Sequence, residues 1–110
     1  MARRLRQAGL ATLLIDLLTA AEETEDLESG RLRFDIPLLS RRVVGATDWL
    51  KRNRGSQNLN IGYFGASTGA AAALLAAVQR PETVSAIVSR GGRPDLAEPV
   101  LAQVRAPTLL

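Results

Sequence analysis

The sequence predicts a three-layer α/β/α fold, in which a mostly parallel sheet lies between helices. Short apolar runs typical of strands in parallel sheets alternate with longer segments of helical periodicity; the runs are Leu10–Ile15, Leu59–Phe64 and Val84–Ser89. Right-handed connections through the intervening helices make neighbouring strands parallel. With 110 residues, of which 46% are apolar and 23% charged, residues 1–110 have the composition of a single globular domain or part of one.

The first half of the chain is expected to contain two helices with one strand between them. Ala2–Ala8 is rich in helix-forming residues, and Gly9 can end that helix in left-handed geometry. The apolar run that follows predicts a strand buried on both faces. The acidic stretch Glu22–Glu28 is expected to be a solvated loop. Asp35 can cap the next helix, whose apolar residues share one core-facing side that includes the tryptophan: Leu38, Leu39, Val43, Ala46, Trp49 and Leu50.

The second half of the chain is expected to continue the alternation of strands and helices. Ala70–Val78 is the most clearly helical segment, because alanine is the best helix former, and Pro81 ends it. A short helix is expected from Asp95 to about Gln103. Pro107 then opens a last apolar run, which predicts the beginning of a fourth strand.

Composition excludes several kinds of site. The chain has no cysteine and no histidine, so it offers no disulfide, no thiolate metal site and none of the usual general bases. We expect no cofactor and no metal. The net charge of +3 comes from basic and acidic residues scattered along the chain, and aromatic residues make up only 4%. A nucleic-acid partner is therefore not expected.

The N-terminal sequence MARRLRQAGLATLLIDLLTAA is similar to a secretory signal, with a basic start and an apolar stretch. Asp16 argues against that interpretation, because a carboxylate within the apolar segment is costly to translocate. No apolar run approaches the ~20 residues that span a bilayer. The sequence therefore predicts a cytoplasmic protein without a membrane partner.

Gly65-Ala66-Ser67-Thr68-Gly69 fits the pattern G-x-S-x-G between a predicted strand and a predicted helix. In a nucleophile elbow this spacing holds the serine in a strained strand-to-helix turn, and the flanking glycines avoid clashes. Two alternatives are a glycine-serine turn that only permits close packing, and a phosphate cradle at the helix N-terminus. The cradle lacks the lysine of a P-loop. The pattern therefore favours a nucleophile elbow with Ser67 as the nucleophile.

At this point the chain resembles the α/β-hydrolases, and among them the dienelactone hydrolase-like group. The resemblance is carried by the segments ARRLRQAGLATLLIDLL, FDIPLLSRRVVGATDWL, IGYFGASTGAAAALLAA and VSAIVSRGGRPDL, the last followed by VRAPTLL. It covers nearly the whole chain and is most specific at the G-x-S-x-G segment. It implies a partial α/β-hydrolase fold that corresponds to the central portion of family members, truncated at both ends.

The resemblance also implies roles for residues of this chain. Ser67 would be the nucleophile, the Thr68 amide one oxyanion-hole donor, and a small-molecule ester or lactone the substrate. The family's second oxyanion donor, acid and histidine fall outside this chain. In the family, the strand that would precede Met1 lies between the strands expected at Leu10 and Leu59. Without that strand the sheet would have open edges, and we therefore expect the chain to self-associate through them.

Within the chain, only weak candidates for the remaining machinery exist. Lys51 is the single lysine, but it lies near the end of a helix that should point away from Ser67. Asp95 follows a predicted strand at a place where some relatives carry the triad acid, although a helix N-cap is the favoured interpretation. Arg90 and Arg93 could bind a substrate carboxylate or phosphate, although solvated surface arginines are the simpler interpretation.

Two classes of function remain open after the sequence is considered. One is a serine hydrolase whose acid and base lie outside this chain, so that the isolated chain is inactive. The other is a non-catalytic remnant or interaction module, or the hydrolase-like part of a phosphoribosyltransferase fusion, since some relatives are fused to such a domain.

Overall fold

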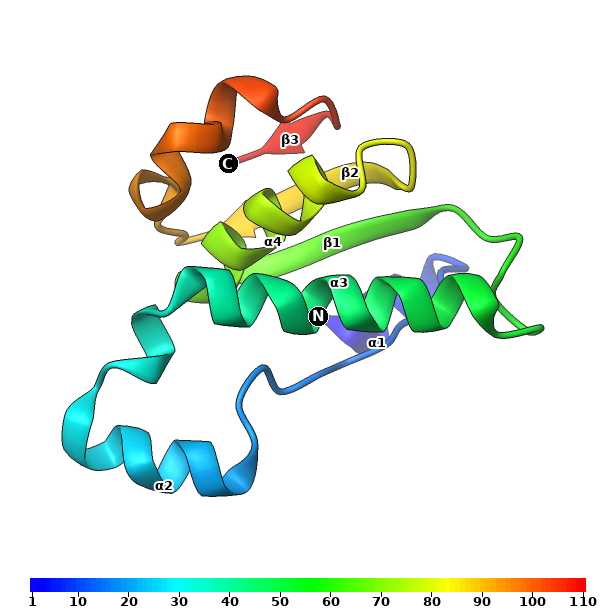
Figure 1. Ribbon diagram of the computed structural model, residues 1–110. Coiled ribbons are helices and arrows are strands. Elements are labelled where there is room, and N and C mark those ends of the chain that lie inside the picture. The colour runs from blue at the N-terminus through cyan, green and yellow to red at the C-terminus, as the bar shows by residue number, and fades with distance from the viewer.

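A computed structural model describes all residues from Met1 to Leu110, and its centre is a parallel sheet of three strands (Figure 1). The strands are β1 (Ile61–Ala66), β2 (Val84–Arg90) and β3 (Thr108–Leu109), in the spatial order β1-β2-β3. β1 pairs with β2 along its whole length, and Ile87 and Val88 of β2 pair with β3. The predicted parallel α/β sheet is therefore confirmed for these strands.

Two helical segments connect the strands and build the core. α4 (Thr68–Gln79) joins β1 to β2, and the 3-10 helix η2 (Pro94–Gln103) joins β2 to β3. α4 carries no bulky side chain on its first turns, and its alanines are almost completely buried between the sheet and α3 (Ile36–Arg52). The core contains these alanines together with Ile36, Leu39, Leu74, Val84, Ile87 and Ala97. In Figure 1, α3 and α4 lie on the same side of the sheet.

α3 begins as the sequence predicts, but its buried face differs. The Asp35 carboxylate accepts a hydrogen bond from the Leu38 amide at 3.1 Å, and Pro37 lies in the first turn. The buried residues of the helix are Ile36, Leu39, Ser40 and Thr47. Trp49 lies two residues beyond Thr47, on the opposite side of the helix, and its exposed fraction is 51%. The prediction that Trp49 is a core residue is wrong.

The first 30 residues contain two helices, and Figure 1 labels both of them. α1 (Ala2–Gln7) ends before Gly9, which has a φ of 90°, as predicted. α2 (Ala20–Ser29) replaces the loop expected at Glu22–Glu28. The reason is a capping box: the Glu22 amide donates to the Thr19 hydroxyl, and the Thr19 amide donates to the Glu22 carboxylate at 2.8 Å.

A short 3-10 helix, η1 (Leu32–Phe34), links α2 to α3 and is held by one buried carboxylate. Asp26 accepts hydrogen bonds from the Leu32 amide at 2.7 Å and from Nε of Arg33 at 2.7 Å. These donors hold the pKa of Asp26 below its usual range, against the opposing effect of burial. The connection between α2 and α3 is therefore fixed by hydrogen bonds rather than by apolar packing.

The strand predicted at Leu10–Ile15 is not formed. This segment runs from α1 toward α2 without helix, turn or sheet pairing, and Leu14 has an exposed fraction of 71%. A strand requires hydrogen-bonding partners for its amides and carbonyls, and the segment pairs with none of the three strands of the sheet. Apolar composition alone was therefore not sufficient to form a strand here.

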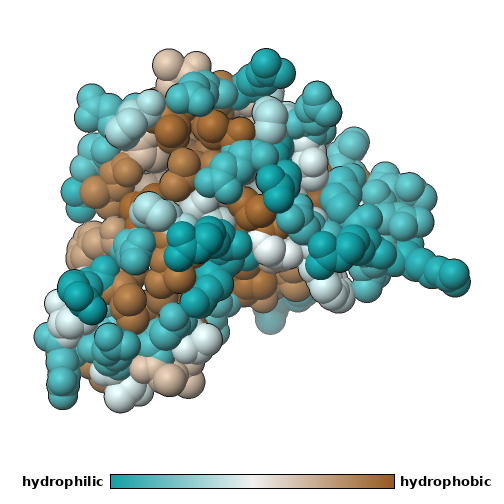
Figure 2. All heavy atoms as spheres, in the orientation of Figure 1, coloured by the Kyte–Doolittle hydropathy of each residue, from teal (hydrophilic) through white to brown (hydrophobic).

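The strands of the sheet are not buried on both faces. Ile61 and Ile87, on the side of α3 and α4, are buried, whereas Gly62, Phe64 and Ala86 are exposed. Apolar residues also reach the surface between hydrophilic ones in the view of Figure 2. None of the helices has the length and apolar character needed to cross a membrane.

Candidate functional site

Ser67 lies in the tight turn between β1 and α4, as the sequence predicts. Its φ of 54° and ψ of −128° place it outside the regions that side-chain-bearing residues favour, and it is the only non-glycine residue of the chain with a positive φ. Such a conformation costs on the order of 1–3 kcal/mol and persists only where the surrounding structure imposes it. Ser67 is solvent-exposed, and its side chain does not cap α4.

Gly65 explains why the turn can be so tight. A β-carbon at Gly65 would lie 2.7 Å from the Gly69 carbonyl oxygen and 2.8 Å from the Ala70 backbone, closer than such atoms approach. The sequence interpretation gave Gly69 a similar role, but a β-carbon there would meet no atom within 4 Å. The expected crowding at Gly69 is therefore wrong, and close packing of the strand against the helix depends on Gly65.

Gly92 is a second glycine on which the turn depends, and sequence analysis assigned it only to a loop. A β-carbon at Gly92 would overlap the Ser89 hydroxyl and lie 2.7 Å from the Ala70 β-carbon. This approach brings the next residue against the turn, where the Arg93 amide donates to the Ser67 carbonyl at 3.4 Å. The Ser67 carbonyl also accepts from the Ala70 amide at 3.1 Å. The backbone of Ser67 is thus held from both α4 and the loop after β2.

Thr68 is the first residue of α4, immediately after Ser67. Amides in the first turn of a helix have no partner within the helix, and the helix dipole adds partial positive charge at that end. Ser67 therefore lies beside backbone groups that can stabilise a developing negative charge.

Arg93 and Asp95 lie close to this turn, but they bind each other. Nε and Nη2 of Arg93 donate to the two Asp95 carboxylate oxygens at 3.0 and 2.9 Å. This ion pair lowers the pKa of Asp95 and raises that of Arg93. The helix cap position belongs to Arg93, and Asp95 is the second residue of η2, so the N-cap interpretation of Asp95 is wrong. Arg90 is exposed at the end of β2, where it pairs in register with Ala66.

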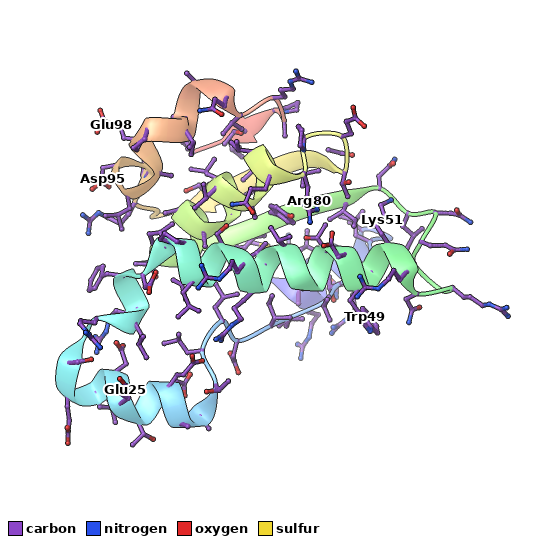
Figure 3. All side chains as sticks on the ribbon, in the orientation of Figure 1. Glu25, Trp49, Lys51, Arg80, Asp95 and Glu98 are labelled. Atoms are coloured by element: carbon purple, nitrogen blue, oxygen red, sulfur yellow. The ribbon has the colours of Figure 1, made fainter.

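Lys51 lies at the opposite end of the sheet from Ser67. Its ammonium donates to the carbonyls of Gln57 at 3.3 Å and Leu59 at 3.0 Å, which precede β1, whereas Ser67 follows that strand. Figure 3 shows Lys51 and Asp95 near opposite ends of the molecule. Lys51 cannot serve as a base for Ser67 in this arrangement.

Two polar pairs that sequence analysis did not identify lie between α3 and the rest of the core. The Tyr63 and Thr47 hydroxyls are 2.6 Å apart, and burial raises the pKa of Tyr63. Arg80 donates two hydrogen bonds of 2.9 Å to Asp48. Neither pair reaches Ser67; the first links α3 to β1, and the second links α3 to the C-terminal end of α4. They fix the scaffold on which the turn is built.

Comparison with known proteins shows what the chain is similar to. No family model matches it. A crystal structure of dienelactone hydrolase from Anabaena variabilis matches 97% of the chain with 66% sequence identity and a TM-score of 0.92. The chain is similar to the dienelactone hydrolase-like α/β-hydrolases. It spans half the length of that solved chain.

Two further relatives come from Mycobacterium tuberculosis, strains CDC 1551 and H37Rv, and both are provisionally named phosphoribosyl transferases. Each is 52% identical over all 110 residues, and the chain spans 24% of the length of each. Similar segments thus occur within longer proteins that carry different names. The fold of the chain is that of part of an α/β-hydrolase.

Proposed function

We propose that this chain provides the nucleophile of a serine hydrolase that acts on a small ester or lactone. The observation that carries the proposal is the strained backbone of Ser67, between a strand whose Gly65 permits close packing and the N-terminus of α4. This is the arrangement that a G-x-S-x-G nucleophile elbow requires. A tight turn needed only for packing would not need a polar side chain at its exposed, strained position.

In the proposed reaction, the Ser67 hydroxyl oxygen attacks the substrate carbonyl carbon and gives its proton to a general base. The Thr68 amide donates a hydrogen bond to the oxyanion that forms. The carbon–oxygen bond to the leaving group then breaks, and that group takes up the proton. Water hydrolyses the acyl-serine by the same steps, which releases the acid and restores Ser67.

The general base has to come from outside these 110 residues. The chain has no histidine, Lys51 is at the other end of the sheet, and Asp95 is engaged by Arg93. Because the members of a catalytic triad act as a unit, the isolated chain is expected to show no ester hydrolysis above background. Turnover that disappears in Ser67→Ala would contradict this expectation.

A chimaera tests the proposed nucleophile directly. The 110 residues replace the matching half of the Anabaena variabilis dienelactone hydrolase, and hydrolysis of an activated ester is measured. Ser67→Ala should reduce kcat/KM by at least about 10³-fold, because it removes the attacking atom. Ser85→Ala, at an exposed position on β2, is the matched control and should retain activity. Equal activity of a folded Ser67→Ala chimaera would exclude Ser67 as the nucleophile.

A second candidate is a hydrolase-like module without catalytic function in a larger phosphoribosyltransferase protein. It is favoured by the 52% identity to relatives of that name, of which the chain spans only 24%. Labelling of the chimaera with a fluorophosphonate distinguishes the two candidates, because it requires an activated serine. Labelling at Ser67 would support the hydrolase, whereas a folded chimaera that remains unlabelled would favour the module.

A further inference from the structure

The loop after β2, residues 91–93, makes a backbone contact with the strained turn at Ser67. The Arg93 amide donates to the Ser67 carbonyl at 3.4 Å, which is long for a hydrogen bond. A bond of that length is weak and depends on other contacts that hold the donor in place. Because a strained backbone persists only where its surroundings impose it, whatever fixes Arg93 also helps to fix Ser67.

The start of the loop does not fix Arg93. Gly91 has a φ of 51°, in the left-handed region that glycine adopts readily, and Gly92 lies where a β-carbon would overlap Ser89. These two glycines let the chain turn from β2 toward α4. Glycine also has the greatest conformational freedom of all residues, so the two positions permit the turn without holding it. The restraint on Arg93 therefore has to come from the residues that follow it.

The 3-10 helix η2 follows Arg93 and is attached to the core. Ala97 has an exposed fraction of 3% and belongs to the core, and Leu96 packs against it. The Arg93 carbonyl accepts a hydrogen bond from the Leu96 amide at 3.1 Å, and the ring of Pro94 fixes one backbone dihedral between them. The backbone that follows Arg93 is therefore held in place, and what remains to be fixed is the orientation of Arg93 itself.

The side chain of Arg93 is fixed by Asp95, two residues later. Nε and Nη2 of Arg93 donate to the two carboxylate oxygens of Asp95 at 3.0 and 2.9 Å. A planar guanidinium bound at two points has a defined geometry, and here the pair closes across the rigid Pro94. Both side chains are about half exposed, at 49% and 55%, so the pair contributes little to global stability. Its effect is local, on the orientation of Arg93.

We propose, on the basis of the proposed function of Ser67, that Asp95 is a positioning residue for the nucleophile. Through its two hydrogen bonds with Arg93 it holds the Arg93 amide against the Ser67 carbonyl, and this contact maintains the strained turn. Asp95 does not touch the substrate and takes up no proton during the reaction. Its lowered pKa agrees with this role, because the carboxylate stays ionised and bound to Arg93.

The geometry favours this role over the two that the sequence allowed. A triad acid accepts a hydrogen bond from the catalytic base, but both Asp95 oxygens already accept from Arg93. An arginine that binds a substrate carboxylate offers its paired donors to it, but Nε and Nη2 of Arg93 are turned to Asp95. Each side chain is thus the partner of the other, and what the pair affects is the backbone next to Ser67.

Amide hydrogen exchange followed by NMR tests the contact in the 110-residue chain, without any reaction. Asp95→Ala removes both acceptors, and the Arg93 amide should then exchange at least about threefold faster. Glu98→Ala is the matched control, because it removes the same charge from an exposed position of η2 and leaves the ion pair intact; Figure 3 labels both residues. It should leave the exchange rate of the Arg93 amide unchanged. Equal rates in the two variants would overturn the proposal.

Kinetics in the chimaera with dienelactone hydrolase test the consequence for catalysis. Asp95→Ala should lower kcat by about tenfold and leave KM within about twofold, because it displaces the attacking oxygen and not the substrate. Glu98→Ala should change neither constant. The exchanged pair Arg93→Asp/Asp95→Arg restores the ion pair in reverse and should recover most of the lost kcat.

The contrary kinetic outcomes differ from one another. A loss as large as that of Ser67→Ala, with no recovery in the exchanged pair, would identify Asp95 as the triad acid and overturn the proposal. A higher KM at unchanged kcat would assign Arg93 to substrate binding and overturn it as well. An unchanged Asp95→Ala chimaera would overturn it while Ser67 remains the nucleophile. An active Ser67→Ala chimaera would contradict the proposed function, and this role of Asp95 with it.

Discussion

The β1-α4-β2 unit and the segment Leu10–Ile15 of the N-terminal arm, by which we mean residues 1–16, are both apolar, yet only the first forms a core. In residues 61–90 each strand has a partner, and Leu74 and Ile87 have exposed fractions of 2% and 1%. In the arm no residue is buried, although Leu10–Ile15 has the composition of a strand. Apolar residues thus contribute to stability only where the backbone beside them is satisfied and a second layer covers them.

The largest expected difference between the two regions is the loss in the free energy of unfolding when a leucine is replaced by alanine. Leu74→Ala should lower the free energy of unfolding by about 3 kcal/mol, because it leaves a cavity between α4 and the sheet. Leu10→Ala, at an exposed position of the N-terminal arm, should change it by less than about 0.5 kcal/mol. Urea unfolding followed by circular dichroism measures both, and similar losses would show that the arm contributes to the core.

The two glycines of the G-x-S-x-G segment should respond in opposite directions. Gly65→Ala should cost about 2 kcal/mol, because the new β-carbon overlaps the backbone of Gly69 and Ala70. Gly69→Ala meets no atom and improves helix propensity, so it should stabilise the chain by up to about 1 kcal/mol. The same unfolding experiment compares the two variants. A larger loss at Gly69 than at Gly65 would contradict the packing described for the turn.

The capping box of α2 should contribute less than the core. Thr19→Ala removes the hydroxyl that accepts from the Glu22 amide, and it should cost about 1 kcal/mol. Thr24 is the control, because its hydroxyl donates only to the Ala20 carbonyl within the same helix, and Thr24→Ala should be close to neutral. Thermal unfolding distinguishes the two, and equal midpoints would show that α2 does not depend on its cap.

The ion pair between Glu22 of α2 and Arg42 of α3 should make the stability of the chain depend on pH. Hydrogen bonds from Arg42 and Thr19 lower the pKa of Glu22 from 4.5 to about 2 in the folded chain. As the pH falls, the unfolded chain takes up the proton first, so this contribution to stability is complete above pH 4.5 and is lost as the pH falls toward 2. Glu22→Gln should flatten the stability profile in that range, and an unchanged profile would assign the dependence to other carboxylates.

Features encoded by adjacent residues were predictable from the sequence. The position of Ser67 between a strand and a helix followed from Gly65, from the apolar run before it and from the alanines after it, and the structure has this arrangement. The parallel pairing of β1 with β2 followed from the helix between them. The capping box of α2 was visible as a threonine followed three residues later by a glutamate, but the acidic composition of the segment led to a loop prediction instead.

Features that depend on distant residues were not predictable. Leu10–Ile15 has the sequence of a strand, but whether it forms one depends on a neighbouring strand that residue order alone does not provide. Aspartate is a common helix N-cap residue, but Arg93, two residues before Asp95, donates to both of its carboxylate oxygens. Trp49 falls on the apolar face that the helical period predicts. The core covers α3 from another side, so Trp49 is exposed.

The groove between β1 and the N-terminal arm is lined by no charged side chain, which has a thermodynamic consequence for any segment that covers it. Association through such a surface has little Coulombic energy for salt to screen, so its strength should vary only weakly with ionic strength. It should instead have a large negative heat-capacity change, which is the signature of apolar burial. Because hydrophobic stabilisation weakens on cooling, temperature is the variable that should control this contact.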